Sequence, residues 1–223
     1  MRLIIFDADG TLINSQAIIL EGLNLTFREF GYPQPQKSDA LATIGLTLDL
    51  LFAKLLNRAV DDEIMAMCVS YKRNAVELLS RPELHSQLYD GIDGVLATLS
   101  KQPETFLAIA TGKSRRGLAK MIETFGYEDK FIALRTSDDC PSKPHPAMIL
   151  ECCEIAGCDA SQTVMIGDSN YDMQMAVEAG AKALGVSWGY QSIEKLQQSG
   201  AQAIVYTPEE IPEAVDNVLA GMG

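Results

Sequence analysis

Short, wholly apolar runs alternate with segments of helical periodicity along most of this chain, and this alternation limits the folds open to it. The expected strands are 3–6, 106–110, 131–134, 163–166 and 183–186, with 203–206 as a late edge strand. The expected helices are 92–99, 114–125, 146–156, 171–179 and 209–219. Continuous apolar strands are buried on both faces, and strands that alternate with helices form parallel sheets. The sequence therefore predicts an α/β fold, a parallel sheet with helices on both faces.

One region interrupts this alternation. Between about 16 and 85 no strand pattern occurs, and apolar residues recur at helical spacing in 18–30, 46–56 and 64–79. We predict an all-helical cap domain, 16–86, inserted into a core domain formed by 1–15 and 87–223. The hinges are expected near 14–16 and 87–91.

The charge and the cysteines limit the partners and the compartment. The formal net charge is −12, and such an acidic surface repels nucleic acids and anionic membranes, so neither is an expected partner. No apolar stretch has the length of a membrane span. The five cysteines are odd in number and form no C-x-x-C pair, which is typical of free thiols in a reducing cytoplasm. We expect a cytoplasmic monomer or homodimer.

Polar side chains follow the ends of the expected strands. They are Asp7, Asp9, Thr111, Lys143, Asp168 and Asp172. Ligands of open parallel sheets bind at the carboxyl ends of the strands, so these side chains should share one edge. Clustered carboxylates repel one another unless a cation joins them, and Mg²⁺ prefers oxygen ligands. Carboxylates, a hydroxyl, an ammonium group and Mg²⁺ together indicate a phosphoryl-transfer site.

Asp7 and Asp9 suggest how such a site would work. An aspartate can attack phosphorus and form an aspartyl phosphate. A second carboxylate two residues later can act first as general acid and then as general base. Gly10 would let the backbone turn closely around the phosphate.

Four motifs occur in a fixed order along the chain. They are Asp7-Ala8-Asp9-Gly10-Thr11, Thr111 after a strand, Lys143 in Ser-Lys-Pro, and Gly167-Asp168-Ser169 followed by Asp172-Met173. With them the sequence resembles the haloacid dehalogenase-like (HAD) hydrolase superfamily, and most of all its phosphoglycolate phosphatase-like branch with a small helical cap. The resemblance covers nearly the whole chain. It implies a Rossmann-like core and a Mg²⁺-dependent phosphatase that acts on a small phosphorylated metabolite through an aspartyl phosphate.

The resemblance also implies roles for individual residues. Asp7 would be the nucleophile, Asp9 the general acid and base, and Thr111 and Lys143 would hold the phosphoryl group. Mg²⁺ would be bound by Asp7, the backbone carbonyl of Asp9, and Asp168. Asp172 would be a further ligand, or would orient Lys143 or a metal-bound water. The substrate-binding set would be Gly10, Thr11, Gly45, Gly112, Lys113 and His145.

Three positions bear on the reaction and its fit to the branch. Related proteins often have Asn where this chain has Gly112; that position serves mainly through its backbone N–H. Dehalogenases and phosphonatases of the superfamily lack the second aspartate, so Asp9 argues against both. β-Phosphoglucomutases carry a cap histidine where Ile19 stands here, which favours water as the phosphoryl acceptor.

Several alternatives stay open at this stage. The chain could be a phosphotransferase or phosphomutase of the same superfamily, or a non-catalytic module that binds phosphate or metal. Phosphoglycolate, a sugar phosphate, a nucleoside monophosphate and pyrophosphate are all candidate substrates. His145 either lines the entrance to the cleft beside Lys143 or leads into a helix. Asp168, taken alone, would read as a helix N-cap.

Some patterns are rejected. The sequence Thr-Gly-Lys-Ser at 111–114 looks like half a P-loop, but the required first glycine is replaced by Leu107. A Ser-His-Asp mechanism is not favoured, because no G-x-S-x-G elbow occurs.

Overall fold

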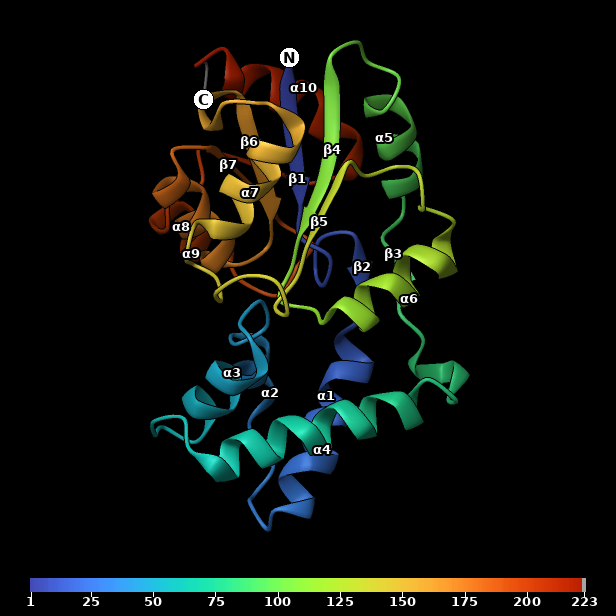
Figure 1. Cartoon of the computed structure of the whole chain (residues 1–223), viewed down its shortest axis with the longest axis vertical. Coiled ribbons are helices and arrows are strands. Elements are labelled where there is room, and N and C mark those ends of the chain that lie inside the picture. Colours follow the sequence, from blue (N-terminus) through green and yellow to red (C-terminus); the bar gives the residue numbers. More distant parts are fainter. Residues whose placement is uncertain (222–223) are drawn as a thin grey trace.

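A computed structural model describes residues 1–221 and contains a six-stranded, wholly parallel sheet (Figure 1). The strand order is β5-β4-β1-β6-β7-β8. The strands are β1 (Arg2–Phe6), β4 (Thr105–Ala110), β5 (Ala133–Arg135), β6 (Thr163–Gly167), β7 (Lys182–Val186) and β8 (Ala203–Val205). The predicted α/β fold is therefore confirmed.

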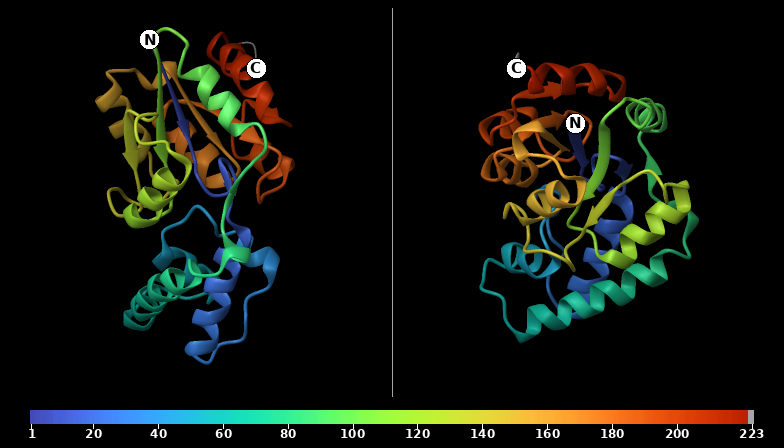
Figure 2. Two further views of the ribbon diagram at one scale, coloured as in Figure 1. Left: turned by 90° about the vertical axis from the view of Figure 1, so that its right-hand side faces the viewer. Right: turned by 45° about the horizontal axis from the view of Figure 1, so that its top comes forward.

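Helices cover both faces of the sheet, and the strand side chains divide between two hydrophobic cores (Figure 2). Side chains alternate across a strand, so Ile4 and Phe6 of β1 enter one core and Leu3 and Ile5 enter the other. The first core is closed by α5 (Ile92–Leu99), α6 (Arg115–Phe125) and α10 (Ile211–Leu219). The second is closed by α7 (Ala147–Ala156), α8 (Asn170–Ala179) and α9 (Ile193–Gln198).

The insert forms a third, separate hydrophobic core built from helices alone. Its helices are α1 (Gln16–Glu29), α2 (Lys37–Leu41), α3 (Leu48–Leu55) and α4 (Asp62–Leu78). Leu23 and Phe27 of α1 pack there with Phe52 of α3 and Met67 of α4. Figure 1 places this body beyond the carboxyl ends of the sheet strands.

The two passages between the bodies are paired with each other. β2 (Ile13–Asn14) and β3 (Gln87–Leu88) form a short antiparallel ladder at the positions predicted as hinges. A 3₁₀ turn, Pro82–Leu84, precedes β3. Within residues 1–221, no helix combines the length and the apolar character needed to cross a membrane.

Element bounds differ from expectation where local signals were weak. The strand expected at 131–134 is β5, which begins only at Ala133, because Phe131 turns inward to pack on the first core. The start of the last helix is a 3₁₀ turn, Pro208–Glu210, and α10 follows with a proline in its first turn. Helices α2 and α9 and the β2–β3 ladder had not been predicted; each is too short to establish a period.

Candidate active site

Three buried carboxylates and one buried lysine meet at the carboxyl edge of the sheet. Asp7 follows β1, Asp168 follows β6, and Asp172 lies in the first turn of α8; their oxygens approach within 4.8 Å of one another. Lys143 reaches them from the loop before α7. Its Nζ lies 2.6 Å from Asp172 Oδ1 and 2.9 Å from Asp7 Oδ1. The structure thus brings together four side chains that the strand ends had predicted as neighbours.

This cluster carries more negative than positive charge in a site closed to water. Burial raises the pKa of Asp7 to about 6, with Asp172 and Asp9 adding to the rise and Lys143 opposing it. Burial, together with Asp172 and Asp7, also raises the pKa of Asp168 well above its usual range. Burial alone would lower the pKa of Lys143, but Asp172 and Asp7 outweigh it and the pKa rises. One lysine cannot balance three carboxylates, and the all-oxygen donor set fits a hard divalent cation such as Mg²⁺.

Asp172 is held by its own helix. Its Oδ2 accepts hydrogen bonds from the backbone N (3.1 Å) and the Oγ (2.6 Å) of Ser169, and Ser169 Oγ in turn accepts from the backbone N of Asp172 at 3.2 Å. This capping box closes the N-terminus of α8. Ser169, not Asp168, is therefore the N-cap. The carboxylate of Asp168 instead accepts from Thr11 Oγ1 at 3.2 Å and from the backbone N of Tyr190 at 2.8 Å.

Asp9 faces a different set of partners. Its Oδ1 accepts hydrogen bonds from Lys113 Nζ at 2.6 Å and from the Oγ of Ser15. The backbone N of Lys113 donates to Thr111 Oγ1 at 3.2 Å, and Thr111 itself is buried at the end of β4. Lys113, predicted to bind substrate, is thus paired with Asp9 in this structure.

Gly10 permits the tight approach between the first motif and Asp168. Its φ is +86°, in the left-handed region, and a Cβ at this position would overlap the Asp168 carboxylate. The turn that follows Asp9 can therefore lie directly against the metal-ligating candidate Asp168.

The helical insert contributes one loop, 42–47, that lies on the strand ends of the sheet (Figure 1). The backbone N of Thr47 donates to Ser142 Oγ at 2.9 Å, and Tyr171 Oη donates to the Ala42 carbonyl at 3.2 Å. Gly45 lies against Gly112 so closely that a Cβ on Gly112 would be 2.6 Å from the Gly45 carbonyl oxygen. The glycine after Thr111 therefore provides room for the cap loop.

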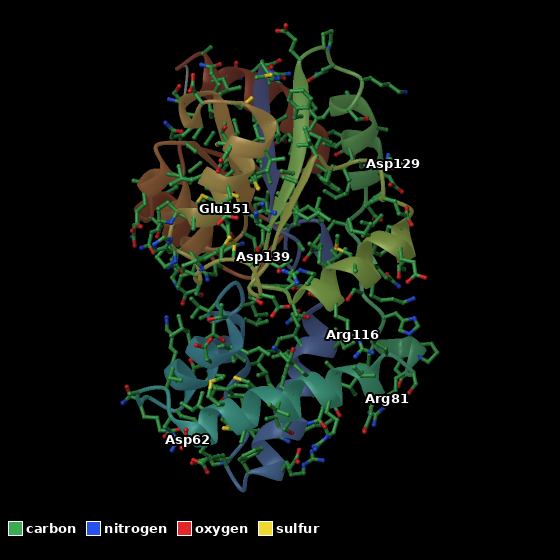
Figure 3. The ribbon with its side chains drawn as sticks, in the orientation of Figure 1. Asp62, Arg81, Arg116, Asp129, Asp139 and Glu151 are labelled. Atoms are coloured by element: carbon green, nitrogen blue, oxygen red, sulfur yellow. The ribbon has the colours of Figure 1, made fainter. Side chains whose placement is uncertain are left out.

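Two groups of predicted or suspected substrate residues lie outside this cluster. His145 is exposed at the start of α7, where its Nδ1 accepts from the backbone N of Ala147 at 3.2 Å. Arg115 pairs with Asp139, and Arg116 is exposed on α6, where Figure 3 places it between that helix and the cap. None of the contacts described for residues 1–221 joins His145 or Arg116 to the carboxylates.

One loop of the site had not been predicted. Residues 188–191 follow β7, and they contact Thr11, Ser15, Asp168 and Asn170. The end of the expected strand 183–186 could have predicted this loop, because a site residue follows each of the strands β4, β1 and β6 at the centre of the sheet.

Together, the parallel sheet, the inserted helical body and the buried carboxylates at the strand ends define a hydrolase with a Rossmann-like core. The chain belongs to the haloacid dehalogenase-like hydrolase family, because the family model matches residues 4–186. It is 32% identical to a protein of Dickeya dadantii described as "Probable phosphatase IndB", over 97% of this chain and 94% of that protein. It is also 32% identical to a phosphoglycolate phosphatase of Pasteurella multocida, over 85% and 87% of the two chains.

A solved structure agrees with these relatives. The crystal structure of a predicted phosphoglycolate phosphatase from Haemophilus somnus superposes with a TM-score of 0.82 at 25% identity, covering 96% of this chain and 97% of the other. The predicted membership of the superfamily, in its phosphoglycolate phosphatase-like branch, is confirmed.

Proposed function

We propose that the chain is a Mg²⁺-dependent phosphatase that hydrolyses a small phosphate monoester through an aspartyl phosphate on Asp7. The observation that carries the proposal is the buried arrangement of Asp7, Lys143, Asp168 and Asp172, with Asp9 on the following turn. The phosphatase names of its relatives support it. We also propose that 16–86 acts as the cap and that 1–15 with 87–223 form the catalytic core.

In the first step, a carboxylate oxygen of Asp7 attacks phosphorus. Asp7 Oδ1 already accepts from the backbone N of Ala8 at 2.7 Å and pairs with Lys143, so Oδ2 is the attacking oxygen. The bond from phosphorus to the ester oxygen breaks, and Asp9 delivers a proton to that oxygen. Thr111 and Lys143 hold the phosphoryl oxygens during the transfer.

In the second step, Asp9 takes a proton from water while the water oxygen attacks phosphorus. The bond between Asp7 and phosphorus breaks and inorganic phosphate leaves, which restores the carboxylate of Asp7 and the protonated form of Asp9. Asp9 is suited to both steps because it lies outside the carboxylate cluster and its Oδ1 is already fixed by donors.

Asp7, the backbone carbonyl of Asp9, and Asp168 would hold Mg²⁺, which supplies positive charge to the phosphoryl oxygens when bound. Asp172 serves as a positioning residue for Lys143, since its two oxygens are engaged by Lys143 and by Ser169. Of the roles that the sequence left open for Asp172, we propose this one.

The substrate is a small phosphorylated metabolite. Loop 42–47 lies directly on Gly112, next to the proposed phosphate ligand Thr111, which supports a small substrate. Relatives are named phosphoglycolate phosphatases, and one from Clostridium perfringens, 29% identical, is named for pyrophosphatase activity. Ile19, at the position of the mutase histidine, packs against the cap core and brings no acid or base, which favours hydrolysis over phosphoryl transfer to a second substrate.

A hydrolysis panel of phosphate esters, run with and without Mg²⁺, tests this function. Wild-type protein should release phosphate only with Mg²⁺, and Asp7→Asn should release none while keeping its circular dichroism spectrum and a cooperative thermal unfolding transition. Mass spectrometry must exclude deamidation of the variant. Substrate binding without turnover by the wild type would instead favour a regulatory module. Turnover by a verified Asp7→Asn protein would remove Asp7 as nucleophile.

Cytoplasmic location and a monomeric or homodimeric state stay predictions. The five cysteines are free and buried, which supports a reducing compartment.

A further inference from the structure

The loop 188–191 connects parts of the site that come from distant stretches of the chain. Trp188 Nε1 donates to the Thr11 carbonyl at 3.1 Å, and the backbone N of Tyr190 donates to Asp168 Oδ2 at 2.8 Å. Gly189 lets the loop approach this closely, because a Cβ there would overlap the Asp168 side chain. The loop therefore contacts both the turn that contains the first motif and the candidate metal ligand Asp168.

The hydroxyl of Tyr190 extends the same loop toward Asp9. It lies 3.0 Å from the backbone N of Ser15 and 3.2 Å from Ser15 Oγ. Ser15 Oγ in turn hydrogen-bonds Asp9 Oδ1. A carboxylate can only accept, so Ser15 donates to Asp9 and Tyr190 donates to Ser15, while the Tyr190 oxygen accepts the Ser15 N–H. The chain of donors from Tyr190 through Ser15 to Asp9 thus has one direction.

We propose that Tyr190 is a positioning residue that sets the carboxylate of Asp9 through Ser15 for proton transfer to the leaving group. The proposal rests on the proposed function, because it gives Asp9 the role of acid and base. Ser15 and Lys113 both hold Oδ1 of Asp9. In residues 1–221 no hydrogen bond is found on Oδ2, so the carboxylate presents that oxygen to the substrate.

Tyr190 contacts Asp168 as well as Ser15, but it does so with two different groups. Its backbone holds Asp168 and its side chain holds Ser15. Removal of the hydroxyl therefore loosens Asp9 while the contact with Asp168 remains. Ser15 precedes α1 and makes no side-chain cap to that helix, so its hydroxyl can be removed without the loss of a helix cap.

The test compares Tyr190→Phe, Ser15→Ala and the double variant, with Tyr206→Phe as control because Tyr206 is largely exposed and directly follows the edge strand β8. Single-turnover and steady-state rates are measured on an alkyl phosphate and on an activated aryl phosphate, each across a Mg²⁺ titration. Wild-type turnover in the same assay checks the proposed function independently of the variants.

We expect Tyr190→Phe to lower kcat about tenfold on the alkyl phosphate, the effect of one hydrogen bond lost from the chain that positions the reacting carboxylate. KM and the Mg²⁺ concentration for half-maximal activity should stay within about twofold, and the aryl phosphate should lose less, because its leaving group needs less protonation. Ser15→Ala should show the same pattern. The double variant should lose no more than the larger single loss, because both changes break one chain.

Three outcomes would overturn the proposal while leaving the phosphatase assignment intact. They are a kcat of Tyr190→Phe within about twofold of wild type on the alkyl phosphate, equal losses on both leaving groups, and multiplicative losses in the double variant. Tyr190→Phe also leaves the Ser15 N–H without its acceptor, which lowers stability. Ser15→Ala keeps that acceptor, so its melting temperature should not change. If both variants then share the loss of kcat, the loss comes from the position of Asp9 and not from lower stability.

Discussion

Gly112→Ala tests whether the cap must close for catalysis. The added Cβ would lie 2.6 Å from the Gly45 carbonyl oxygen, 2.9 Å from its carbonyl carbon and 3.0 Å from the Leu46 carbonyl oxygen. All three atoms belong to the backbone of loop 42–47, so the overlap cannot be relieved by the rotation of a side chain. The φ of Gly112 lies outside the left-handed region, so the conflict of an added Cβ there is with loop 42–47 and not with the local backbone conformation. The substitution therefore acts against the closed state.

The size of the effect follows from the overlap. An ordinary contact begins near 3.4 Å, so the cap loop must retreat by several tenths of an ångström or more from the strand ends. Overpacking of this kind costs about 1–3 kcal/mol. If catalysis needs the closed state, kcat/KM should fall about 5- to 150-fold on a substrate that depends on cap contacts. The loss should be smaller on acetyl phosphate, an activated acyl phosphate that needs little from the cap.

The assay measures kcat/KM on both substrates together with the melting temperature. Gly94→Ala is the matched control, because Gly94 lies within α5 and a Cβ there meets nothing within 4 Å; it should leave activity unchanged and add about 0.5–1 kcal/mol of stability. Gly45→Arg would also perturb this contact, but Gly45 has a φ of +105°, so any side chain there strains the backbone as well. A kcat/KM of Gly112→Ala within about twofold of wild type on every substrate would refute the closure argument.

Three further predictions concern proton transfer, metal and pH. Asp9→Asn should slow aspartyl-phosphate formation far more with poor than with good leaving groups, and the phosphoenzyme should persist because water attack loses its base; equal losses in single-turnover formation rate would contradict this. EDTA should abolish turnover, Mg²⁺ should restore it, and Ca²⁺ should inhibit, because its looser coordination disturbs in-line transfer; full activity in excess chelator would contradict the metal requirement. Burial raises the pKa of Asp7 from 3.8 to about 6, so the metal-free folded protein binds more protons than the unfolded chain between these values. The contribution of Asp7 to stability should therefore be fully present below about pH 4 and be lost as pH rises through about 6. Melting temperatures in EDTA should decline across that window in the wild type and less in Asp7→Asn, and identical pH slopes would show that Asp7 is not the cause.

Much of the fold and part of the site could be predicted, because both depend on where apolar runs end. The runs around Leu3, Ile109 and Met165 placed β1, β4 and β6 within about a residue of their observed bounds. A parallel sheet aligns those ends on one edge. The residues that follow, among them Asp7 and Asp168, were therefore predictable as neighbours before any tertiary contact was known.

Contacts made sideways between loops could not be predicted in this way. Lys113 meets Asp9 and Tyr190 meets Ser15 across long stretches of sequence. Periodicity places a strand end, but the path of the following loop depends on what packs against it. The sequence therefore assigns Lys113 to the substrate only through the resemblance, and it gives no signal for Tyr190.

Asp172 lies between these two cases. The sequence left its role open between metal ligand and partner of Lys143, yet Ser169 and Asp172 have the spacing of a capping box. The start of α8 fixes one carboxylate oxygen through bonds that need no other part of the protein. The second oxygen is thereby aimed out of the helix, where it meets Lys143 at 2.6 Å. The same local signal that begins a helix thus places the charge that holds the lysine. Disruption of this N-terminus would displace Lys143 from Asp7, even though the two residues share no segment of the chain.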